Sequence, residues 1–96
     1  MNPALPMIGY VYILKSDRKD WIYIGMTSDL SRRLQQHYLG KNYSTKRYLP
    51  VRLVYYEAYS SIADAMKREK SLKYYGNALR ELKKRIANSL GKGGAG

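Results

Sequence analysis

The chain has 96 residues, enough for one small domain, and that length leaves no room for a second catalytic domain. Its 18 lysines and arginines outnumber 7 acids, and the formal charge of +11 favours polyanionic partners, nucleic acid before a membrane surface. Because cysteine is absent, disulfides and thiolate zinc sites are excluded. No apolar run approaches the ~20 residues of a membrane span, and the first residues do not resemble a signal peptide, so we expect a cytoplasmic protein with no membrane partner.

The folded domain is expected to span residues 7–90. The end of the chain from 91 to 96 is rich in glycine. We expect this end and residues 1–6 to be flexible or to be sequence added for expression.

Two β-branched and aromatic runs, 8–14 and 21–25, predict a hairpin around the polar segment 15–20. Both faces of each run are apolar, which indicates a sheet covered on two sides. If Leu14 lies opposite Trp21, then Tyr12 lies opposite Tyr23 and both tyrosines share one face of the sheet.

A helix is predicted to follow this hairpin. Ser28 is a good N-cap, Asp29 suits the first turn, and Gly40 ends the helix. The apolar stripe is formed by Leu30, Leu34 and Tyr38. On a helical wheel Arg33 and His37 border this stripe while Arg32 points away, so Arg33 is the arginine that can face the sheet.

The second half of the chain predicts a third strand, about 51–59, and two more helices. Ser61 and Asp64 form a capping-box-like start to the first of these. The last helix is predicted near 78–90, with Asn77 as its cap. The inner face of the first helix is predicted to contain Ile62, Ala65, Met66 and Leu72. The expected fold is therefore α+β, a small three-stranded central sheet flanked by about three helices in the order ββαβαα.

Glu69 falls within the apolar sector of the predicted 61–75 helix. A carboxylate in that position is costly to bury unless it is paired or binds a metal. Lys73, one turn later, offers a helix salt bridge worth about 0.3–0.5 kcal/mol if exposed. A divalent cation such as Mg²⁺ or Mn²⁺ is the other partner that would explain the placement.

Taken in order, Tyr10-Val11-Tyr12, Tyr23-Ile24-Gly25, Arg33, His37 and Glu69 resemble the signature of the GIY-YIG nucleases. The resemblance runs from about residue 10 to residue 73 and is closest to small stand-alone bacterial members. The first triplet departs from the pattern, since Tyr10 stands where the family has glycine.

The resemblance implies the catalytic residues and a single Mg²⁺ or Mn²⁺ ion. It assigns Glu69 to the metal, Arg33 to the scissile phosphate and His37 to a hydrogen bond that helps activate a tyrosine. The family also has a phosphate-contacting asparagine after the glutamate helix. Asn77 is the nearest candidate, but it follows Glu69 by only eight residues and a role as helix cap explains it better.

The activity implied is hydrolysis of a DNA phosphodiester, with water activated by Tyr12 or Tyr23. An unperturbed tyrosine is a poor base at pH 7, and we expect Arg33, the metal and the net charge to favour its phenolate. The other tyrosine would orient water or phosphate. Basic residues would contact backbone phosphates without reading bases, namely Lys15, Arg18, Lys19, Lys41, Lys46 and Arg47.

A rival function is a binding module that holds DNA or RNA and cleaves nothing, which the small size favours. A ribosome-associated protein is a third alternative, disfavoured because a passive binder needs no core-facing acid. For the nuclease we expect low sequence specificity and no small-molecule cofactor. The expected substrate is DNA, with branched or damaged DNA among the candidates. RNA remains an alternative substrate.

Overall fold

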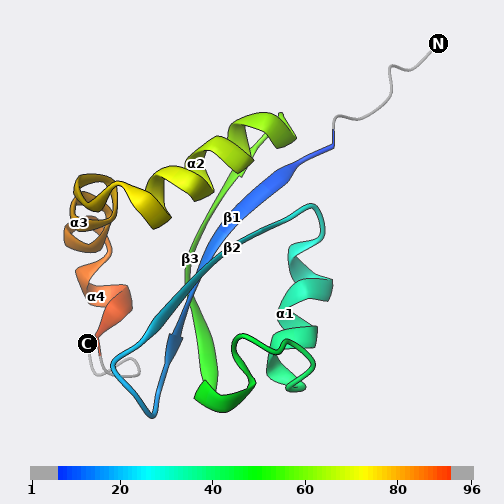
Figure 1. Cartoon of the computed structure of the whole chain (residues 1–96), viewed down its shortest axis with the longest axis vertical. Coiled ribbons are helices and arrows are strands. Elements are labelled where there is room, and N and C mark those ends of the chain that lie inside the picture. Colours follow the sequence, from blue (N-terminus) through cyan, green and yellow to red (C-terminus); the bar gives the residue numbers. More distant parts are fainter. Residues whose placement is uncertain (1–6, 92–96) are drawn as a thin grey trace.

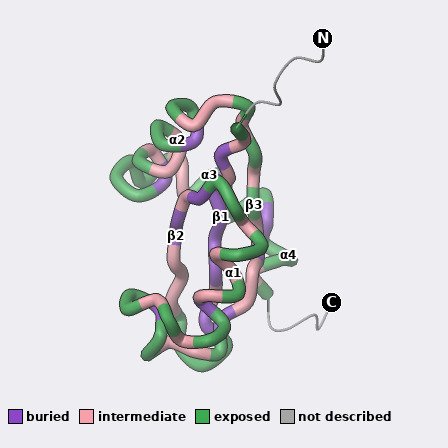
Figure 2. The backbone as a smooth tube through the Cα atoms, turned by 90° about the vertical axis from the view of Figure 1, so that its right-hand side faces the viewer, coloured by how far each residue is buried: buried purple, intermediate pink, exposed green. Residues whose placement is uncertain are grey.

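The computed structural model describes residues 7–91, so the segments 1–6 and 92–96, expected to be flexible or added for expression, lie outside the described residues. Three antiparallel strands form one sheet in the order β2-β1-β3 (Figure 1), with β1 at Gly9–Ser16, β2 at Ile22–Thr27 and β3 at Val51–Tyr59. The central strand β1 is the most buried of the three (Figure 2). The expected α+β class and the order ββαβαα are confirmed.

The register of the hairpin differs from the expected one by two residues. Tyr12 lies opposite Gly25, and Leu14 lies opposite Tyr23. The pairing continues as far as Lys15 and Ile22, which places the connecting loop at 16–21. A slip of two residues keeps every side chain on its face, so the two tyrosines still share a face although they are diagonal neighbours.

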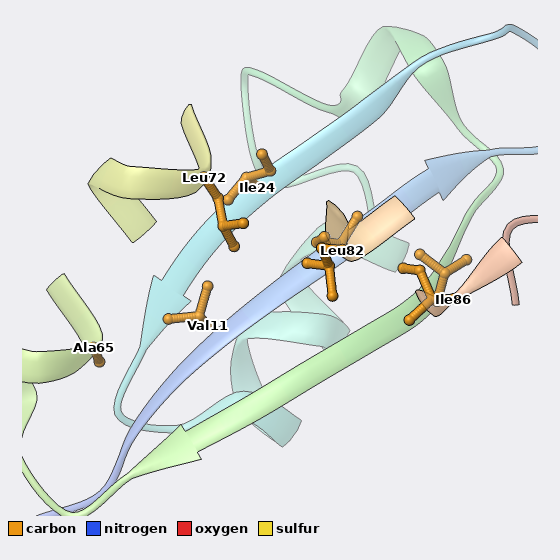
Figure 3. Close-up of a cluster of buried hydrophobic side chains, with 8 residues drawn as sticks. Val11, Ile24, Ala65, Leu72, Leu82 and Ile86 are labelled. Carbon is orange, nitrogen blue, oxygen red and sulfur yellow. The ribbon is translucent and has the colours of Figure 1, made fainter. Parts of the chain in front are cut away.

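Helices cover both faces of the sheet, as the apolar pattern predicts (Figure 1). On one face lies α1 at Leu30–Tyr38, together with a short 3-10 turn at Lys46–Tyr48. The other face carries α2 at Ile62–Tyr74, α3 at Gly76–Arg85 and α4 at Ala87–Leu90. Figure 3 shows this second core, in which Val11 and Ile24 of the sheet face Leu72 and Leu82 of the helices.

Helix boundaries follow local chemistry and correct some of the expected caps. The cap of α1 is Asp29 rather than Ser28, because the Asp29 carboxylate accepts a hydrogen bond from the Arg32 backbone N–H. Gly40 follows the end of α1 at φ +74°, a left-handed conformation that suits glycine. The Ser61 hydroxyl caps α2, as predicted.

Two expectations for the C-terminal helices are wrong. Met66 is 54% exposed, so it is not part of the inner face of α2. Asn77 does not cap the last helix, since Tyr75 is the N-cap and the Asn77 side chain accepts a hydrogen bond from Arg80 within the first turn. The predicted single helix is also interrupted at Ile86, which separates α3 from α4. No helix within residues 7–91 has the length and apolar character needed to cross a membrane.

Candidate active site

Two tyrosines lie on the face of the sheet that α1 covers. Tyr12 of the central strand is fully buried, and Tyr23 of the edge strand β2 is half-buried. Their ring centroids lie 6.2 Å apart. A Cβ atom placed on Gly25 would lie 2.5 Å from the Tyr12 hydroxyl oxygen. The glycine of the Tyr23-Ile24-Gly25 triplet therefore makes room for the phenol of Tyr12.

Helix α1 presents Arg33 and His37 to the sheet from successive turns. Arg33 is half-buried and Arg32 is exposed. This agrees with the orientation that the helical wheel predicts. His37 is fully buried, although it lies in the last turn of the helix.

The His37 ring lies between two hydroxyl groups. Its Nε2 atom lies 2.8 Å from the Tyr12 hydroxyl, and its Nδ1 atom lies 2.8 Å from Oγ1 of Thr45. The edges of the Tyr12 and Tyr23 rings approach the imidazole, with centroids 5.7 Å and 5.2 Å away. Each buried polar atom in this row of three side chains has a hydrogen-bond partner, and the two hydrogen bonds fix the orientation of the imidazole.

Thr45 is a member of the site that sequence reasoning missed. It lies in the connection between α1 and β3, where residues on either side are exposed and no periodicity marks one position as buried. Only the fold, which places this connection under the C-terminal end of α1, identifies it.

Burial and neighbouring charges alter the ionisation of this group. Burial lowers the pKa of His37 from its ordinary value of 6.5, and the positive charge of Arg33 lowers it further. Burial also raises the pKa of Tyr12, and Tyr23 and Glu69 add to that effect, whereas the Arg33 guanidinium lowers it by its charge and by hydrogen bonding. The expectation that positive charge would favour a phenolate is therefore wrong for Tyr12 in the free protein, because desolvation outweighs Arg33.

We predict that stability falls as the pH is lowered from about 7 to below 6.5 because of His37, the one histidine in the chain. Its folded pKa lies below 6.5, so the unfolded chain binds a proton at a higher pH than the folded chain does. The stability that neutral His37 contributes is therefore complete above pH 6.5 and is lost as the pH falls through the folded pKa, at up to about 1.4 kcal/mol per pH unit. Thermal midpoints measured across this range test the prediction. A His37→Gln protein should show a flatter profile, and equal slopes would contradict the assignment.

Glu69 lies on α2, the helix that packs against β1 and β2. Its side chain is 25% exposed, and Oε2 lies 3.4 Å from Nζ of Lys73. The carboxylate is close enough to raise the pKa of Tyr12, so it belongs to the same electrostatic group as the residues on α1. The salt bridge to Lys73 is formed, and the charge of Glu69 also acts on Tyr12, so both of the expected partners of Glu69, Lys73 and a divalent cation, are compatible with its position.

A second half-buried acid, Glu57 on β3, provides a comparison. Its carboxylate accepts hydrogen bonds from the Tyr55 hydroxyl at 2.7 Å, from the Tyr59 hydroxyl and from the Arg68 guanidinium at 3.1 Å. These contacts lower the pKa of Glu57 despite its burial. Glu57 is thus saturated with donors from the protein, whereas the partner of Glu69 within residues 7–91 is one ammonium.

The donor set around Glu69 suits a hard divalent cation that keeps most of its water. No group of three histidine, cysteine or acidic side chains gathers anywhere in residues 7–91, which argues against a site built wholly from protein ligands. Mg²⁺ is commonly held by one or two carboxylates, with water and substrate phosphates in its other positions. Glu69 also borders a hollow of about 370 Å³, lined by Met66, Lys67, Lys70, Lys73 and Tyr74. One carboxylate at an open hollow fits such an ion.

Basic side chains gather where the β1–β2 loop meets the connection between α1 and β3. The Arg18 guanidinium donates to the carbonyl of Arg47, and the Lys19 ammonium lies 5.5 Å from the centre of the Tyr48 ring. Trp21 and Tyr48 stack at 3.7 Å between centroids and hold the two loops side by side. Four of the six residues proposed to contact phosphate therefore come together here: Arg18, Lys19, Lys46 and Arg47.

The two other residues proposed to contact phosphate, Lys15 and Lys41, do not belong to this basic cluster. Lys15 is half-buried and lies 3.9 Å from Asp20, and Lys41 is exposed after α1. Asn77 is exposed on α3, where its side-chain oxygen accepts a hydrogen bond from Arg80.

Comparison with known proteins agrees with this arrangement. Residues 8–73 match the family model of the GIY-YIG catalytic domain. The UPF0213 proteins of Streptococcus pyogenes serotypes M5 and M2 are each 44% identical over 61 residues, which are 62% of this chain and 65% of theirs. The match thus spans just under two thirds of those relatives. The solution NMR structure of the UPF0213 protein from Bacillus halodurans aligns with a TM-score of 0.52 at 33% identity, covering 93% of this chain and 89% of that one.

Proposed function

The chain belongs to the GIY-YIG family, and on that premise we propose that it is a divalent-metal-dependent endonuclease that hydrolyses DNA phosphodiester bonds with low sequence specificity. One observation carries the proposal beyond family membership. Tyr12, Tyr23, Arg33 and Glu69, from four different elements, are close enough for the last three to shift the pKa of the first. A titratable group whose pKa is shifted by burial and by several neighbouring groups is typical of catalytic sites.

Tyr12 is the better candidate for the general base. Its hydroxyl has a proton acceptor in Nε2 of His37 at 2.8 Å. Burial keeps Tyr12 protonated in the free protein, so it acts as a base only by passing its own proton to His37 as it takes one from water. The low pKa of His37 keeps the imidazole neutral and ready to accept at pH 7.

Tyr23 and Arg33 have supporting roles on the substrate side. Tyr12 is fully buried, so water reaches its hydroxyl only when a neighbouring side chain moves. Arg33 is half-buried beside that hydroxyl, and turning its guanidinium onto a phosphate would uncover the phenol. Arg33 would then stabilise the charge that grows on the phosphate in the transition state. Tyr23, also half-buried, would orient the water or a phosphate oxygen.

Glu69 is the residue that would hold the divalent cation. When bound there, Mg²⁺ or Mn²⁺ supplies Lewis acidity to a phosphate oxygen and to the leaving 3′ oxygen. The protein would contribute the Glu69 carboxylate as the ligand of the ion, with water and substrate oxygens completing its coordination. Lys73 competes with the ion for that carboxylate in the free protein.

The basic cluster formed by Arg18, Lys19, Lys46 and Arg47 would place the DNA backbone. Its positive side chains stand beside the stacked rings of Trp21 and Tyr48. Lysine and arginine contacts of this kind fix position and carry no sequence information. Lys15 and Lys41 would extend the contacts along the strand.

A cleavage assay separates this function from a binding module that holds DNA or RNA and cuts neither. The purified protein is incubated with linear, branched and single-stranded DNA and with RNA, in Mg²⁺, in Mn²⁺ and in EDTA. We expect DNA products that carry 3′-hydroxyl ends, formed with metal and absent in EDTA. Binding without products on every substrate would establish the module instead.

Affinity for DNA is expected to depend steeply on salt and weakly on sequence. The charge of +11 implies that counterion release dominates binding. Titrations of several unrelated duplexes at increasing salt measure both quantities. Neutralising two residues of the basic cluster, as in Lys46→Ala with Arg47→Ala, should lower the salt slope by about two. A shallow slope for the wild type, or a strong preference for one sequence, contradicts the prediction.

A further inference from the structure

Thr45 is buried in a connection whose neighbouring residues Ser44 and Lys46 are exposed. Its backbone is held on both sides. The Thr45 N–H donates to the Asn42 carbonyl at 3.3 Å, and its carbonyl accepts from the Tyr48 N–H at 2.9 Å. With the backbone fixed, the side chain has a defined direction, and Oγ1 ends 2.8 Å from Nδ1 of His37.

A neutral imidazole carries one proton, so one of its nitrogens donates and the other accepts. The burial of His37 keeps the ring neutral. Whichever nitrogen holds the proton determines whether Nε2 can accept from Tyr12 or must donate to it. Only the first arrangement lets His37 take up the proton of Tyr12.

The surroundings of Tyr12 favour that first arrangement. The Arg33 guanidinium is close enough to the Tyr12 hydroxyl to lower the pKa of Tyr12, and Nε2 of His37 lies 2.8 Å from the hydroxyl oxygen. If Arg33 donates to the oxygen, the phenol proton is free to point to Nε2. The proton of the imidazole must then lie on Nδ1, where Oγ1 of Thr45 accepts it.

We propose that Thr45 is a positioning residue that holds His37 in the tautomer with its proton on Nδ1, so that Nε2 accepts the Tyr12 proton. In the step that results, the Tyr12 O–H bond breaks as the Nε2–H bond forms, and Tyr12 takes a proton from water as the hydroxide attacks phosphorus. The bond from phosphorus to the 3′ oxygen breaks, and that oxygen leaves with a proton from solvent. The hydrogen bond that Nδ1–H donates to Oγ1 of Thr45 persists throughout and stabilises the imidazolium.

The effect of Thr45 on catalysis rests on the proposed nuclease function. Its effect on the tautomer of His37 does not depend on that function. The charged and titratable groups facing the His37 ring are Arg33 on its own helix, Tyr12 of β1 and Tyr23 of β2. The charge of Glu69 on α2 acts on Tyr12, whose pKa it raises. Thr45 is not titratable, so its replacement changes the hydrogen bond to Nδ1 without removing a charged or titratable group.

The first test is nitrogen-15 NMR of the histidine ring, and it needs no substrate. His37 is the one histidine in the chain, so its ring signals are unambiguous. We expect the Nδ1–H tautomer in the wild type and in Thr45→Ser, which keeps the hydroxyl. In Thr45→Val, which has nearly the same shape and no acceptor, the proton should shift at least partly to Nε2. An Nε2–H tautomer in the wild type, or identical spectra for Thr45→Val and wild type, overturns the proposal.

The second test is cleavage by the same three proteins. Thr45→Val should lower kcat by roughly tenfold or more, within the 10²–10⁴-fold that general acid–base catalysis supplies, and should leave KM nearly unchanged. Thr45→Ser should recover most of the rate. A Thr45→Val protein with wild-type kcat, or a loss that Thr45→Ser shares, contradicts the positioning role. Should the wild type cleave nothing, the nuclease function fails, and the NMR result still decides whether Thr45 sets the tautomer.

Thermal midpoints show whether Thr45→Val is folded. If it is not, the wild-type and Thr45→Ser spectra still decide the tautomer, because each must show the proton on Nδ1.

Discussion

Replacing Glu69 by glutamine is expected to abolish metal-dependent cleavage while leaving the protein folded and able to bind DNA. The change keeps the side-chain volume and removes the negative charge that would hold the ion. Because Glu69 is surrounded by Lys67, Lys70 and Lys73, its loss should leave DNA affinity unchanged or tighter. The salt bridge to Lys73 is partly exposed, so we expect its loss to change stability by no more than about 0.5 kcal/mol.

Two variants make this result specific. Glu81→Gln removes an equal charge and a comparable helix salt bridge, with Lys84 at 3.4 Å, from an exposed position on α3. It should cleave like the wild type. Lys73→Met removes the salt bridge and leaves the Glu69 carboxylate free for an ion, so activity should persist and need less metal. If Glu69→Gln and Lys73→Met behave alike, Glu69 is only the partner of Lys73.

Replacing Arg33 by alanine is expected to lower the cleavage rate by roughly 10²-fold or more, as for removal of a preorganised transition-state charge. Arg33 also lowers the pKa of Tyr12, so its loss makes the phenol a poorer proton donor to His37. Arg32→Ala is the matched control, since Arg32 is exposed on the adjacent position of α1. It should weaken DNA binding slightly and leave the rate of the bound complex unchanged.

The Arg33 variant has a readout that does not depend on cleavage. Arg33 lowers the pKa of His37 by its charge. That pKa should therefore rise in Arg33→Ala and stay constant in Arg32→Ala when the ring is titrated by NMR. Equal effects of the two substitutions, on rate or on this pKa, would show that the orientation of α1 is wrong.

Local patterns were sufficient to predict the three strands, the positions of α1 and α2, and the shared face of Tyr12 and Tyr23. The β-branched and aromatic runs predicted the strands, and the stripe on α1 placed Arg33 towards the sheet because helical spacing leaves little choice. The predicted register was wrong by two residues, but the prediction that Tyr12 and Tyr23 share a face remained correct, since side chains alternate with a period of two.

What escaped prediction depends on contacts between distant parts of the chain. Thr45 is 8 residues from His37, and its burial follows from how the connection folds under α1. The pKa of Tyr12 was predicted to fall because positive charges could be counted in the sequence, whereas its burial could not. Met66 was assigned to the core from the helical pattern of α2, but its side chain is exposed and lines the hollow beside Glu69.

The central claim is that this chain is itself a metal-dependent DNA nuclease whose ion is held by Glu69. Its most direct test is the initial rate of plasmid nicking by wild type and Glu69→Gln, purified identically and assayed at equal concentration in Mn²⁺ and in EDTA. Nicking by the wild type in Mn²⁺ alone, with Glu69→Gln at background, is the result we predict. Two results would contradict the claim. Equal nicking by both proteins would point to a contaminating nuclease or to another site. No nicking by either protein would leave a protein that only binds DNA.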